Sequence, residues 1–153
     1  MEKKRGDTYF MQRALKLAQT AALINEVPVG AVVVHDHKII GRGRNQVEAR
    51  KDASQHAELT ALKQAAKKLG RWRLGGCTLY VTLEPCSMCA GAMVLSRIDR
   101  LVYAASDPKA GACGSVFNIV EDKRLNHLVT VEGGLLAKEA SQLLKDFFKK
   151  RRS

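Results

Sequence analysis

The sequence predicts an α/β protein of three layers, in which a central five-stranded mixed sheet carries helices on both faces. Two observations predict this class. Helical and extended segments alternate along the chain in the order α-β-β-α-β-α-β-β-α, which is typical of a sheet covered by helices. The first extended segment, residues 29–35, is almost entirely apolar, as expected for a strand that is buried on both faces.

The first half of the chain predicts two helices and a pair of strands. A first helix is expected because apolar residues recur at helical spacing, at Met11, Leu15, Ala18 and Ala22. The first strand is followed by a turn and an antiparallel partner, whose glycines weaken it toward its end. A polar loop then leads to a helix that Gly70 ends. The predicted bounds are 7–23 and 56–69 for the helices, 29–35 and 39–43 for the strands, and 44–55 for the loop.

The second half predicts three further strands and two helices. The first of these helices contains small residues that allow close packing against the sheet, namely Ala90, Gly91 and Ala92. Trp72, the only tryptophan, is expected to pack over the sheet, with stacking on a base as the alternative. The predicted bounds are 77–83, 100–105 and 128–132 for the strands, 87–97 and 135–150 for the helices, and 106–117 for a glycine-containing loop.

Length and composition indicate one domain over residues 1–153 that ends in a basic C-terminal helix. A chain of 153 residues is long enough for a proper core. No apolar run approaches the ~20 residues of a membrane span, and the charged N-terminus lacks the apolar stretch of a signal peptide. We therefore expect a cytoplasmic protein without a membrane partner. The four cysteines, two of them in a C-x-x-C, fit reduced thiols and a metal site better than disulfides.

Two short motifs together predict one metal site, H-A-E at residues 56–58 and P-C-S-M-C at residues 85–89. The expected ligands are His56, Cys86 and Cys89. A helix that starts near Cys86 favours the thiolate form, which is the form that binds metal. One imidazole and two thiolates suit Zn²⁺ better than Mg²⁺ or Ca²⁺. Because three protein ligands leave a fourth tetrahedral position for water, as in catalytic sites, we expect one Zn²⁺ per subunit.

Glu58 is the expected catalytic residue, because a carboxylate there can move protons to and from that water. Residues two apart in the middle of a helix point to nearly opposite sides. His56 and Glu58 can therefore serve one site only if they lie in the first helical turn, with the metal just beyond the helix end. Residues 51–55 are polar and are expected to form a loop, so a helix can start directly after them, at His56.

Each motif has a simpler interpretation when it is taken alone. A C-x-x-C can be a redox pair or half of a structural zinc site, and an H-x-E occurs by chance in many helices. A closed structural site needs a fourth ligand, and the candidates lack ligand spacing to one another: His35, His37, His127, Cys77 and Cys113. The ordered combination, with each motif at the start of a predicted helix, is more specific, and it is the signature of zinc nucleobase deaminases.

The chain is strongly basic, with 26 Lys and Arg against 15 Asp and Glu and a net charge of +11. This excess suits a polyanionic partner, since phosphate contacts supply much of the affinity for nucleic acid; a solvated basic surface is the alternative. Phe147 and Phe148 precede four basic residues. They are either core or interface residues, or part of an RNA contact that combines stacking with phosphate neutralisation. Phe148 is included among the expected substrate contacts.

Taken as a whole, the sequence resembles the bacterial tRNA adenosine deaminases, within the cytidine deaminase-like fold. The matching stretches are VPVGAV at 27–32, HAE at 56–58, EPCSMCAGAMV at 84–94, SRI at 96–98, GACGS at 111–115, LNH at 125–127 and DFFKKRR at 146–152. Many deaminases share the cysteine motif, whereas its flanking residues, the GACGS loop and the basic aromatic end are more particular to the tRNA branch. The chain departs from the family at residues 52–55, which read D-A-S-Q where D-P-T-A is frequent.

The resemblance implies a homodimer that converts adenosine to inosine at the wobble position of a tRNA, with the anticodon stem-loop as its partner. It also implies that Asn45 contacts the flipped base, that backbone groups around Val29 and Ala57 complete the pocket, and that Asp107 contacts the neighbouring nucleotide. An anticodon loop already exposes its bases, so extruding one costs less than it does in a duplex.

Two other functions remain open at this point. A small-molecule deaminase acting on guanine, cytosine or a free nucleoside would share the zinc site but would need neither the positive charge nor the basic tail. A zinc-stabilised RNA-binding module without catalysis would not need an acid such as Glu58 beside the metal.

Overall fold

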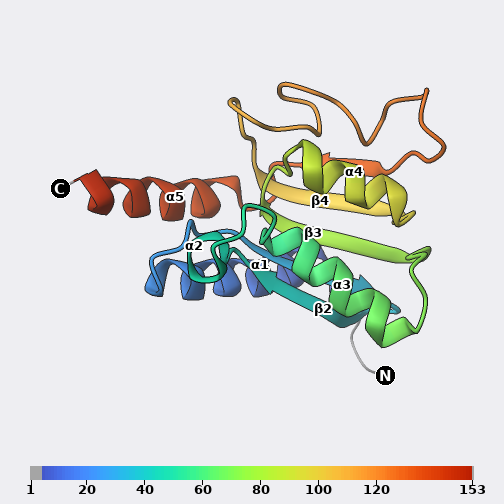
Figure 1. Ribbon diagram of the computed structural model, residues 1–153, viewed down its shortest axis with the longest axis horizontal. Coiled ribbons are helices and arrows are strands. Elements are labelled where there is room, and N and C mark those ends of the chain that lie inside the picture. Colours follow the sequence, from blue (N-terminus) through green and yellow to red (C-terminus); the bar gives the residue numbers. More distant parts are fainter. Residues whose placement is uncertain (1–4, 153) are drawn as a thin grey trace.

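The computed structural model describes residues 5–152 and confirms the three-layer class (Figure 1). The strands are β1 (Gly30–His35), β2 (Lys38–Arg44), β3 (Cys77–Leu83), β4 (Arg100–Ala105) and β5 (Thr130–Gly133). The helices are α1 (Asp7–Leu23), α2 (Val47–Arg50), α3 (Ala57–Leu69), α4 (Ser87–Leu95) and α5 (Ala137–Arg152). The five strands form one mixed sheet in the order β2-β1-β3-β4-β5. β1 is antiparallel to both of its neighbours, and β3, β4 and β5 are parallel.

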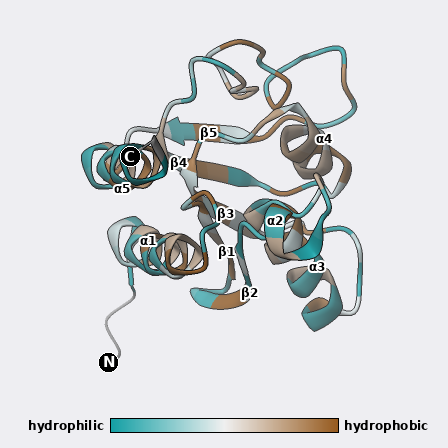
Figure 2. Ribbon diagram, turned by 60° about the vertical axis from the view of Figure 1, so that its left-hand side comes forward, coloured by the Kyte–Doolittle hydropathy of each residue, from teal (hydrophilic) through white to brown (hydrophobic). Residues whose placement is uncertain are grey.

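A different pair of helices covers each face of the sheet. α1 and α5 lie together on one face, and α3 and α4 lie together on the other (Figures 1 and 2). Because side chains alternate across a strand, neighbouring residues of β1 enter different cores. Val32 belongs to the cluster that contains Met11 of α1, whereas Val33 packs with Ala61 of α3 and Met93 of α4. Burial on both faces explains why this strand is apolar along its whole length.

Two glycines of β2 allow α3 to lie directly against the sheet. A Cβ atom at Gly41 would lie 2.1 Å from the carbonyl oxygen of Ala61, and one at Gly43 would lie 2.0 Å from that of Ala57. Both distances are far below van der Waals contact, so any side chain at these positions would push the helix outward. The sequence suggested only that these glycines weaken the strand. In the structure they set the position of α3, which begins beside His56.

The polar loop expected over residues 44–55 contains one helical turn, α2. The buried carboxylate of Glu26 accepts hydrogen bonds from the backbone N–H groups of Glu48 (3.0 Å) and Ala49 (2.7 Å). These N–H groups lie at the start of α2, where a helix has no backbone partners of its own. The contacts join residues that are 22 and 23 positions apart, so no local sequence pattern predicts them.

Several expectations differ from the structure, among them the bounds of α5, which is Ala137–Arg152 rather than 135–150. Trp72 does not pack over the sheet: it lies in the loop between α3 and β3 with 60% of its surface exposed. α4 ends at Leu95 rather than residue 97, because the backbone of Arg97 is left-handed (φ 63°). The last strand begins at Thr130, two residues later than predicted. Within residues 5–152, no helix combines the length and apolar character that crossing a bilayer requires.

Candidate active site

The three predicted ligands converge where α3 and α4 begin. His56 is the N-cap of α3 and Cys86 is the N-cap of α4, both with extended backbone, and Cys89 lies in the first turn of α4. The Nδ1 atom of His56 is 3.6 Å from Sγ of Cys86 and 3.5 Å from Sγ of Cys89. All three donor atoms lie within 4.8 Å of one another. The structure therefore brings the predicted set together, and the set can hold one metal ion.

The electrostatics of the cluster prepare one of the three donors, Cys86, for metal binding. Hydrogen bonding to Cys89 and to His56 lowers the pKa of the Cys86 thiol to about 3, so that Cys86 is a thiolate at neutral pH. The same contact with Cys86 raises the pKa of His56. The neighbouring Cys86 sulfur, together with burial, raises the pKa of Cys89. One thiolate is thus present in the isolated chain, and thiolate is the form that binds metals.

Glu58 lies at the same site, in the first turn of α3. α3 begins at Ala57, between His56 and Glu58. In the middle of a helix, residues two apart point to nearly opposite sides, but at the helix start both side chains can face the same site. The Glu58 side chain is 4% exposed, and both residues line one pocket. Burial raises the pKa of Glu58 to about 7. A carboxyl group that titrates near neutral pH can both accept and donate a proton.

A cavity of about 320 Å³ opens beside the cluster, and Asn45 is one of the residues that line it. Asn45 is 8% exposed, and its Oδ1 atom is buried without a hydrogen-bond partner. Buried polar atoms are normally paired, so this oxygen is available to a ligand. The predicted contacts Val29, Ala57 and Asp107 also line the cavity. The other lining residues are Glu26, Val27, Val47, Glu48, His56, Glu58, Leu83, Glu84, Cys86, Ala110 and Arg151.

The wall that contains Asp107 is organised by Glu84, a residue that sequence analysis did not single out. The buried carboxylate of Glu84 accepts hydrogen bonds from the backbone N–H groups of Asp107, Cys113 and Ser115, each at 3.0 Å, and from the Ser115 hydroxyl. Burial opposes ionisation, but these hydrogen bonds lower the pKa of Glu84. A Cβ at Gly111 would lie 2.4 Å from the Glu84 carboxyl group. One signal was present in the sequence, an acid directly before the Pro-Cys motif.

Asp107 has a structural role as well as a place in the cavity. Its Oδ1 atom accepts hydrogen bonds from the backbone N–H groups of Lys109 (3.0 Å) and Ala110 (3.2 Å). This arrangement is a turn in which an Asp side chain caps the following backbone. The other carboxylate oxygen takes no part in this turn.

The C-terminal helix reaches the cavity through Arg151 rather than through Phe148. Phe148 is 43% exposed and does not line the cavity; its ring centroid lies 5.3 Å from that of the buried Phe147. Arg151, whose guanidinium lies 5.2 Å from the Phe147 ring, is the only Lys or Arg among the lining residues. Sequence analysis counted Arg151 only as part of a basic run, because the packing angle of α5 decides which cation reaches the cavity.

The remaining histidines and cysteines lie elsewhere. Among the residues that the structure describes, His56, Cys86 and Cys89 form the one group of three or more potential ligands whose donor atoms converge. Cys77 and Cys113 are buried outside this group, as expected. The Nε2 atom of His127 lies 2.6 Å from the carbonyl oxygen of Ile98, to which it donates a hydrogen bond. No fourth protein ligand therefore closes the candidate metal site within residues 5–152.

Comparison with known proteins identifies the family. The chain matches the MafB19-like deaminase family over residues 6–152. It is 51% identical over 147 residues to the tRNA-specific adenosine deaminase of Haemophilus influenzae, covering 95% of this chain and 85% of that protein. It is 45% identical over 146 residues to the enzyme of the same name from Bacillus subtilis, covering 95% and 91% of the two chains. The chain belongs to the tRNA-specific adenosine deaminases.

Solved structures agree with this membership of the tRNA-specific adenosine deaminases. A structure from a study of A-to-I editing by tRNA:A34 deaminases matches with a TM-score of 0.86 and 42% identity, covering 90% of this chain and 99% of that one. A guanine deaminase from Nitrosomonas europaea matches with a TM-score of 0.81 and 26% identity, covering 93% and 84%. The predicted family and fold are therefore confirmed, and identity is higher to the tRNA deaminases than to this guanine deaminase.

Proposed function

We propose that this protein hydrolyses the exocyclic amino group of adenosine at the wobble position of a tRNA anticodon, which gives inosine and ammonia. One observation carries the proposal. Four residues line one cavity: His56 and Cys86 of the three-donor cluster, the buried acid Glu58, and Asn45, whose side-chain oxygen is unpaired. The third donor, Cys89, lies within 4.8 Å of the other two. This combination supplies a metal site, a carrier of protons and a hydrogen-bond acceptor for a base.

The donor set fits Zn²⁺, one ion per subunit. In a tetrahedral site with Zn–S of about 2.3 Å and Zn–N of about 2.1 Å, a sulfur and a nitrogen donor lie about 3.6 Å apart. The separations of His56 Nδ1 from the sulfurs of Cys86 and Cys89 are 3.6 and 3.5 Å. Thiolate and imidazole donors also favour zinc over Mg²⁺ or Ca²⁺. When bound, the ion supplies Lewis acidity that lowers the pKa of water toward ~7.

The residues of the chain hold the base and move the protons. Val29 and Ala57 form walls of the cavity, and Asn45 Oδ1 accepts a hydrogen bond from the nucleoside. The Glu58 carboxylate takes a proton from the water that attacks C6 and delivers it to N1 of the ring. Once C6 has both a hydroxyl and an amino group, the Glu58 carboxylate takes the hydroxyl proton and passes it to the departing amino group. The C6–N6 bond breaks as the C6 carbonyl forms. One water is consumed, one ammonia is released, and Glu58 returns to its starting state.

Several features support an RNA substrate over a free base. Identity is 51% to a tRNA-specific adenosine deaminase and 26% to a guanine deaminase. The net charge of +11 suits a polyanion, and Arg151 is a cation at the cavity where a phosphate beside the reacting nucleoside would lie. Asp107 and the half-exposed Phe148 are proposed to contact the neighbouring nucleotides. Because the proposed substrate is a tRNA, we propose a cytoplasmic location for the enzyme.

The surface of α4 supports a homodimer. Its sequence, SMCAGAMVL, is apolar on all sides, and Figure 2 colours it toward the hydrophobic end of the scale. A helix of this kind is normally buried all round. However, Met88 and Leu95, two turns apart on one side, are 37% and 70% exposed. A second copy of the chain that packs on this side of α4 would cover both residues.

A paired measurement tests the proposed reaction. Wild-type protein and a Glu58→Ala variant are each given an anticodon stem-loop with adenosine at the wobble position, free adenosine and free guanine. We expect inosine only in the stem-loop, and only with the wild type, while the variant keeps its bound zinc and its affinity for RNA. Comparable turnover of a free base would favour the small-molecule deaminase, and unchanged activity of the variant would refute Glu58 as the proton carrier.

A further inference from the structure

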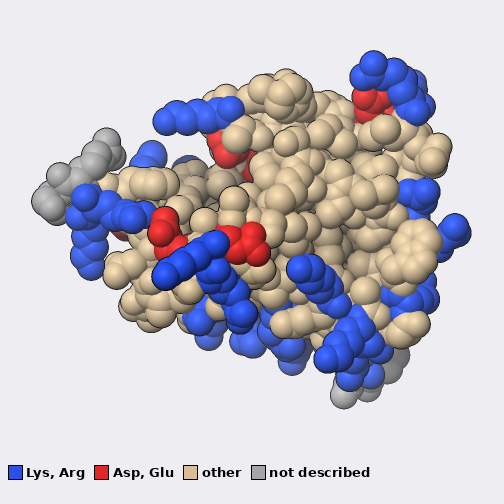
Figure 3. Space-filling view, in the orientation of Figure 1, with Lys and Arg blue, Asp and Glu red and all other residues tan. Residues whose placement is uncertain are grey.

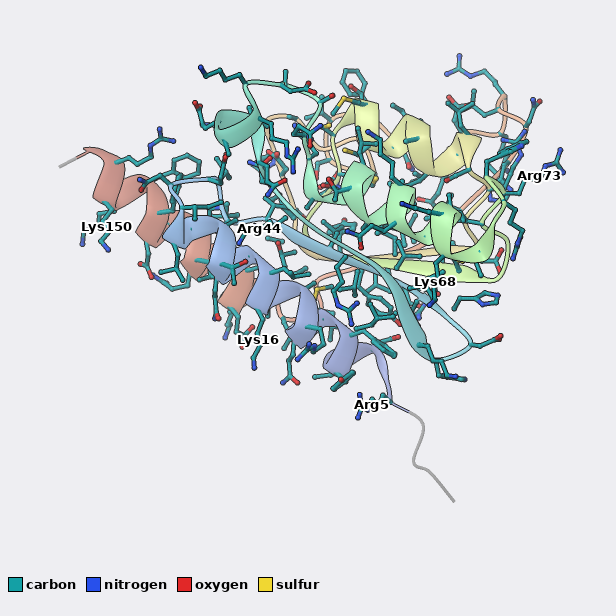
Figure 4. All side chains as sticks on the ribbon, turned by 60° about the horizontal axis from the view of Figure 1, so that its bottom comes forward. Arg5, Lys16, Arg44, Lys68, Arg73 and Lys150 are labelled. Atoms are coloured by element: carbon teal, nitrogen blue, oxygen red, sulfur yellow. The ribbon has the colours of Figure 1, made fainter. Side chains whose placement is uncertain are left out.

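A basic cluster with an exposed tryptophan lies at the far end of α3. Residues 59–83 contain five Lys or Arg and no Asp or Glu. In Figure 3, Lys and Arg gather at the lower right, over the end of α3 and the loop that follows it. Figure 4 labels two members, Lys68 on the last turn of α3 and Arg73 in the loop, and shows them far from Lys150 of α5. The cluster consists of Lys63, Lys67, Lys68, Arg71, Trp72 and Arg73, all exposed.

Hydrogen bonds fix the loop of the cluster, and its cations have no ion-pair partners among the described residues. Arg71 donates hydrogen bonds to the carbonyl oxygens of Arg73 (2.7 Å) and Gly75 (3.3 Å), and these bonds fix the loop. The Arg73 guanidinium lies 5.0 Å from the centroid of the Trp72 ring, within the range of a cation–π contact. Among the described residues, none of the five cations forms an ion pair with a carboxylate. The positive charge is therefore not neutralised within the subunit.

Three acids lie near the cluster without cancelling its charge. Asp52 interacts electrostatically with Lys63. Asp36 and Asp99 act on the buried Cys77 together with Arg71, so they border the base of the loop, and Asp36 pairs with His35 at 3.5 Å. The five cations of the cluster still exceed these three carboxylates.

The cluster is remote from the cavity. The 13 residues of α3 span about 20 Å at 1.5 Å per residue, and His56 lies at the opposite end of the helix from Gly70. None of the cluster residues lines the cavity. Any contact that the cluster makes with the proposed substrate must therefore involve RNA outside the nucleotides that surround the reacting adenosine.

A polyanion fits the cluster better than another protein surface does. A second copy of the chain would place five cations against a basic surface, which like-charge repulsion opposes. RNA instead offers a row of phosphates for Lys and Arg, and an exposed indole gives an unpaired base or a sugar a face to stack on. We propose that this cluster is a second docking surface, which binds the phosphate backbone of the substrate tRNA outside its anticodon loop. The inference rests on the proposed function, because that function supplies the RNA.

The single tryptophan allows a direct test on the unmodified protein. Because Trp72 is the only tryptophan, intrinsic fluorescence excited at its red edge reports on this cluster alone. We expect full-length tRNA to change the emission intensity or wavelength at saturation, and a minimal hairpin, the anticodon loop closed by two base pairs, to bind without changing either. N-acetyltryptophanamide titrated with the same RNA corrects for absorption by the nucleic acid. An unchanged signal with saturating tRNA would overturn the proposal.

A matched pair of triple variants tests the energetic role. Lys67→Ala/Lys68→Ala/Arg73→Ala removes three cluster cations, and a control removes three exposed lysines elsewhere, Lys16, Lys123 and Lys138. For the cluster variant we expect KM for full-length tRNA to rise about five- to tenfold with unchanged kcat, and the slope of log Kd against log salt to become shallower by about 2 to 3. The control should change KM less than twofold, and neither variant should affect the minimal hairpin.

The outcomes separate this proposal from the proposed function. An equal loss on tRNA and on the minimal hairpin, or no loss on tRNA, would overturn the docking surface. A change in sedimentation mass without a change in RNA affinity would instead identify a protein interface and would also overturn it. If the wild type forms no inosine in either RNA, the proposed function fails, while tRNA affinity and Trp72 fluorescence still decide whether the cluster binds RNA.

Discussion

Asn45 Oδ1 is the one buried side-chain nitrogen or oxygen atom that the folded chain leaves without a hydrogen-bond partner, within the described residues. Leaving a buried polar atom without a partner costs on the order of 1–3 kcal/mol. A ligand that supplies a donor recovers that free energy on binding. Asn45 therefore stabilises the substrate-bound protein relative to the free protein. The free energy gained is larger than that of a hydrogen bond at the surface.

Replacing Asn45 should separate activity from stability. For Asn45→Ala we expect kcat/KM on the stem-loop to fall about ten- to hundredfold, because one buried hydrogen bond to the substrate is lost. Thermal stability should stay the same or rise, because the free protein no longer buries an unpaired oxygen. Kinetics and calorimetry on the same preparations measure both effects. Asn118→Ala, at a loop position away from the cavity, is the control; a variant that loses stability and keeps its activity would contradict this role.

At the residue scale, the sequence was most informative where chemistry restricts the residue type. His56, Cys86, Cys89 and Glu58 were predictable because few side chains bind zinc or carry protons, and both motifs start helices. Glu84 and Arg151 were not predictable in the same way. Glu84 bonds to groups 23 to 31 positions away, and Arg151 reaches the cavity only through the packing of α5. Phe148 was assigned a contact because its chemistry is suitable; that it does not line the cavity follows from tertiary structure.

At the scale of elements, the active site depends on how closely α3 lies against β2. His56 and Glu58 are fixed by the start of α3, and the helix is positioned by Gly41 and Gly43. A glycine also allows close helix packing on the opposite face of the sheet, since a Cβ at Gly30 would lie 2.1 Å from the carbonyl oxygen of Ala14 in α1. Backbone contacts of this kind adjust poorly, because neither partner has a side chain that can move aside.

A methyl group at Gly43 should therefore displace the metal ligand. For Gly43→Ala we expect a loss of about 1–3 kcal/mol in the free energy of unfolding and weaker zinc retention against a chelator, because the Cβ meets the carbonyl oxygen of Ala57, next to His56. Denaturant titration and a colorimetric zinc assay measure the two quantities. Gly75→Ala, where a Cβ meets nothing within 4 Å, should change neither. Full zinc retention in the Gly43→Ala variant would show that α3 can move without disturbing the site.

The start of α1 is attached to the sheet by charge. Asp7 accepts two hydrogen bonds from Arg100 of β4, at 2.8 and 2.6 Å, and one from the Tyr80 hydroxyl of β3 at 2.6 Å. Arg100 also pairs with Glu132 of β5. Hydrogen bonding to Arg100 lowers the pKa of Asp7 from its ordinary 3.8 to about 2, against the opposing effect of burial. One arginine thus joins α1 to the parallel half of the sheet.

This network predicts part of the acid sensitivity. A carboxyl group whose pKa is lower in the folded state stabilises the fold above its unfolded pKa, and that contribution is lost as the pH falls from about 4 toward 2. The stability difference between wild type and Asp7→Asn should therefore shrink over this range, as measured by urea unfolding at several pH values. Glu139→Gln is the control, because Glu139 is exposed and takes part in none of the ion pairs of residues 5–152. A difference for Asp7→Asn that is constant with pH would exclude the mechanism.

At the scale of the whole molecule, the order of helices and strands and the periodicity of their apolar residues were enough to predict three layers around five strands. The strand order was not predictable in this way, since it depends on which edges pair after the chain has crossed the sheet. The extra turn α2 and the exposed position of Trp72 were missed for the same reason, because both follow from contacts between distant residues. Close packing of α4 against the sheet was predicted from its small residues, whereas the exposure of its other side, at Met88 and Leu95, was not.

That outward side leads to a prediction about assembly. A glutamate in place of Leu95 would put a charge in the proposed contact between subunits, where it could be neither hydrated nor paired. For Leu95→Glu we expect sedimentation to show a monomer at concentrations where the wild type is a dimer. Leu23→Glu is the matched control, since Leu23 is 83% exposed at the end of α1, on the opposite face of the sheet, and should leave the mass unchanged. A dimer that persists in the Leu95→Glu variant would show that the subunits pack through another surface and that the apolar side of α4 needs a different explanation.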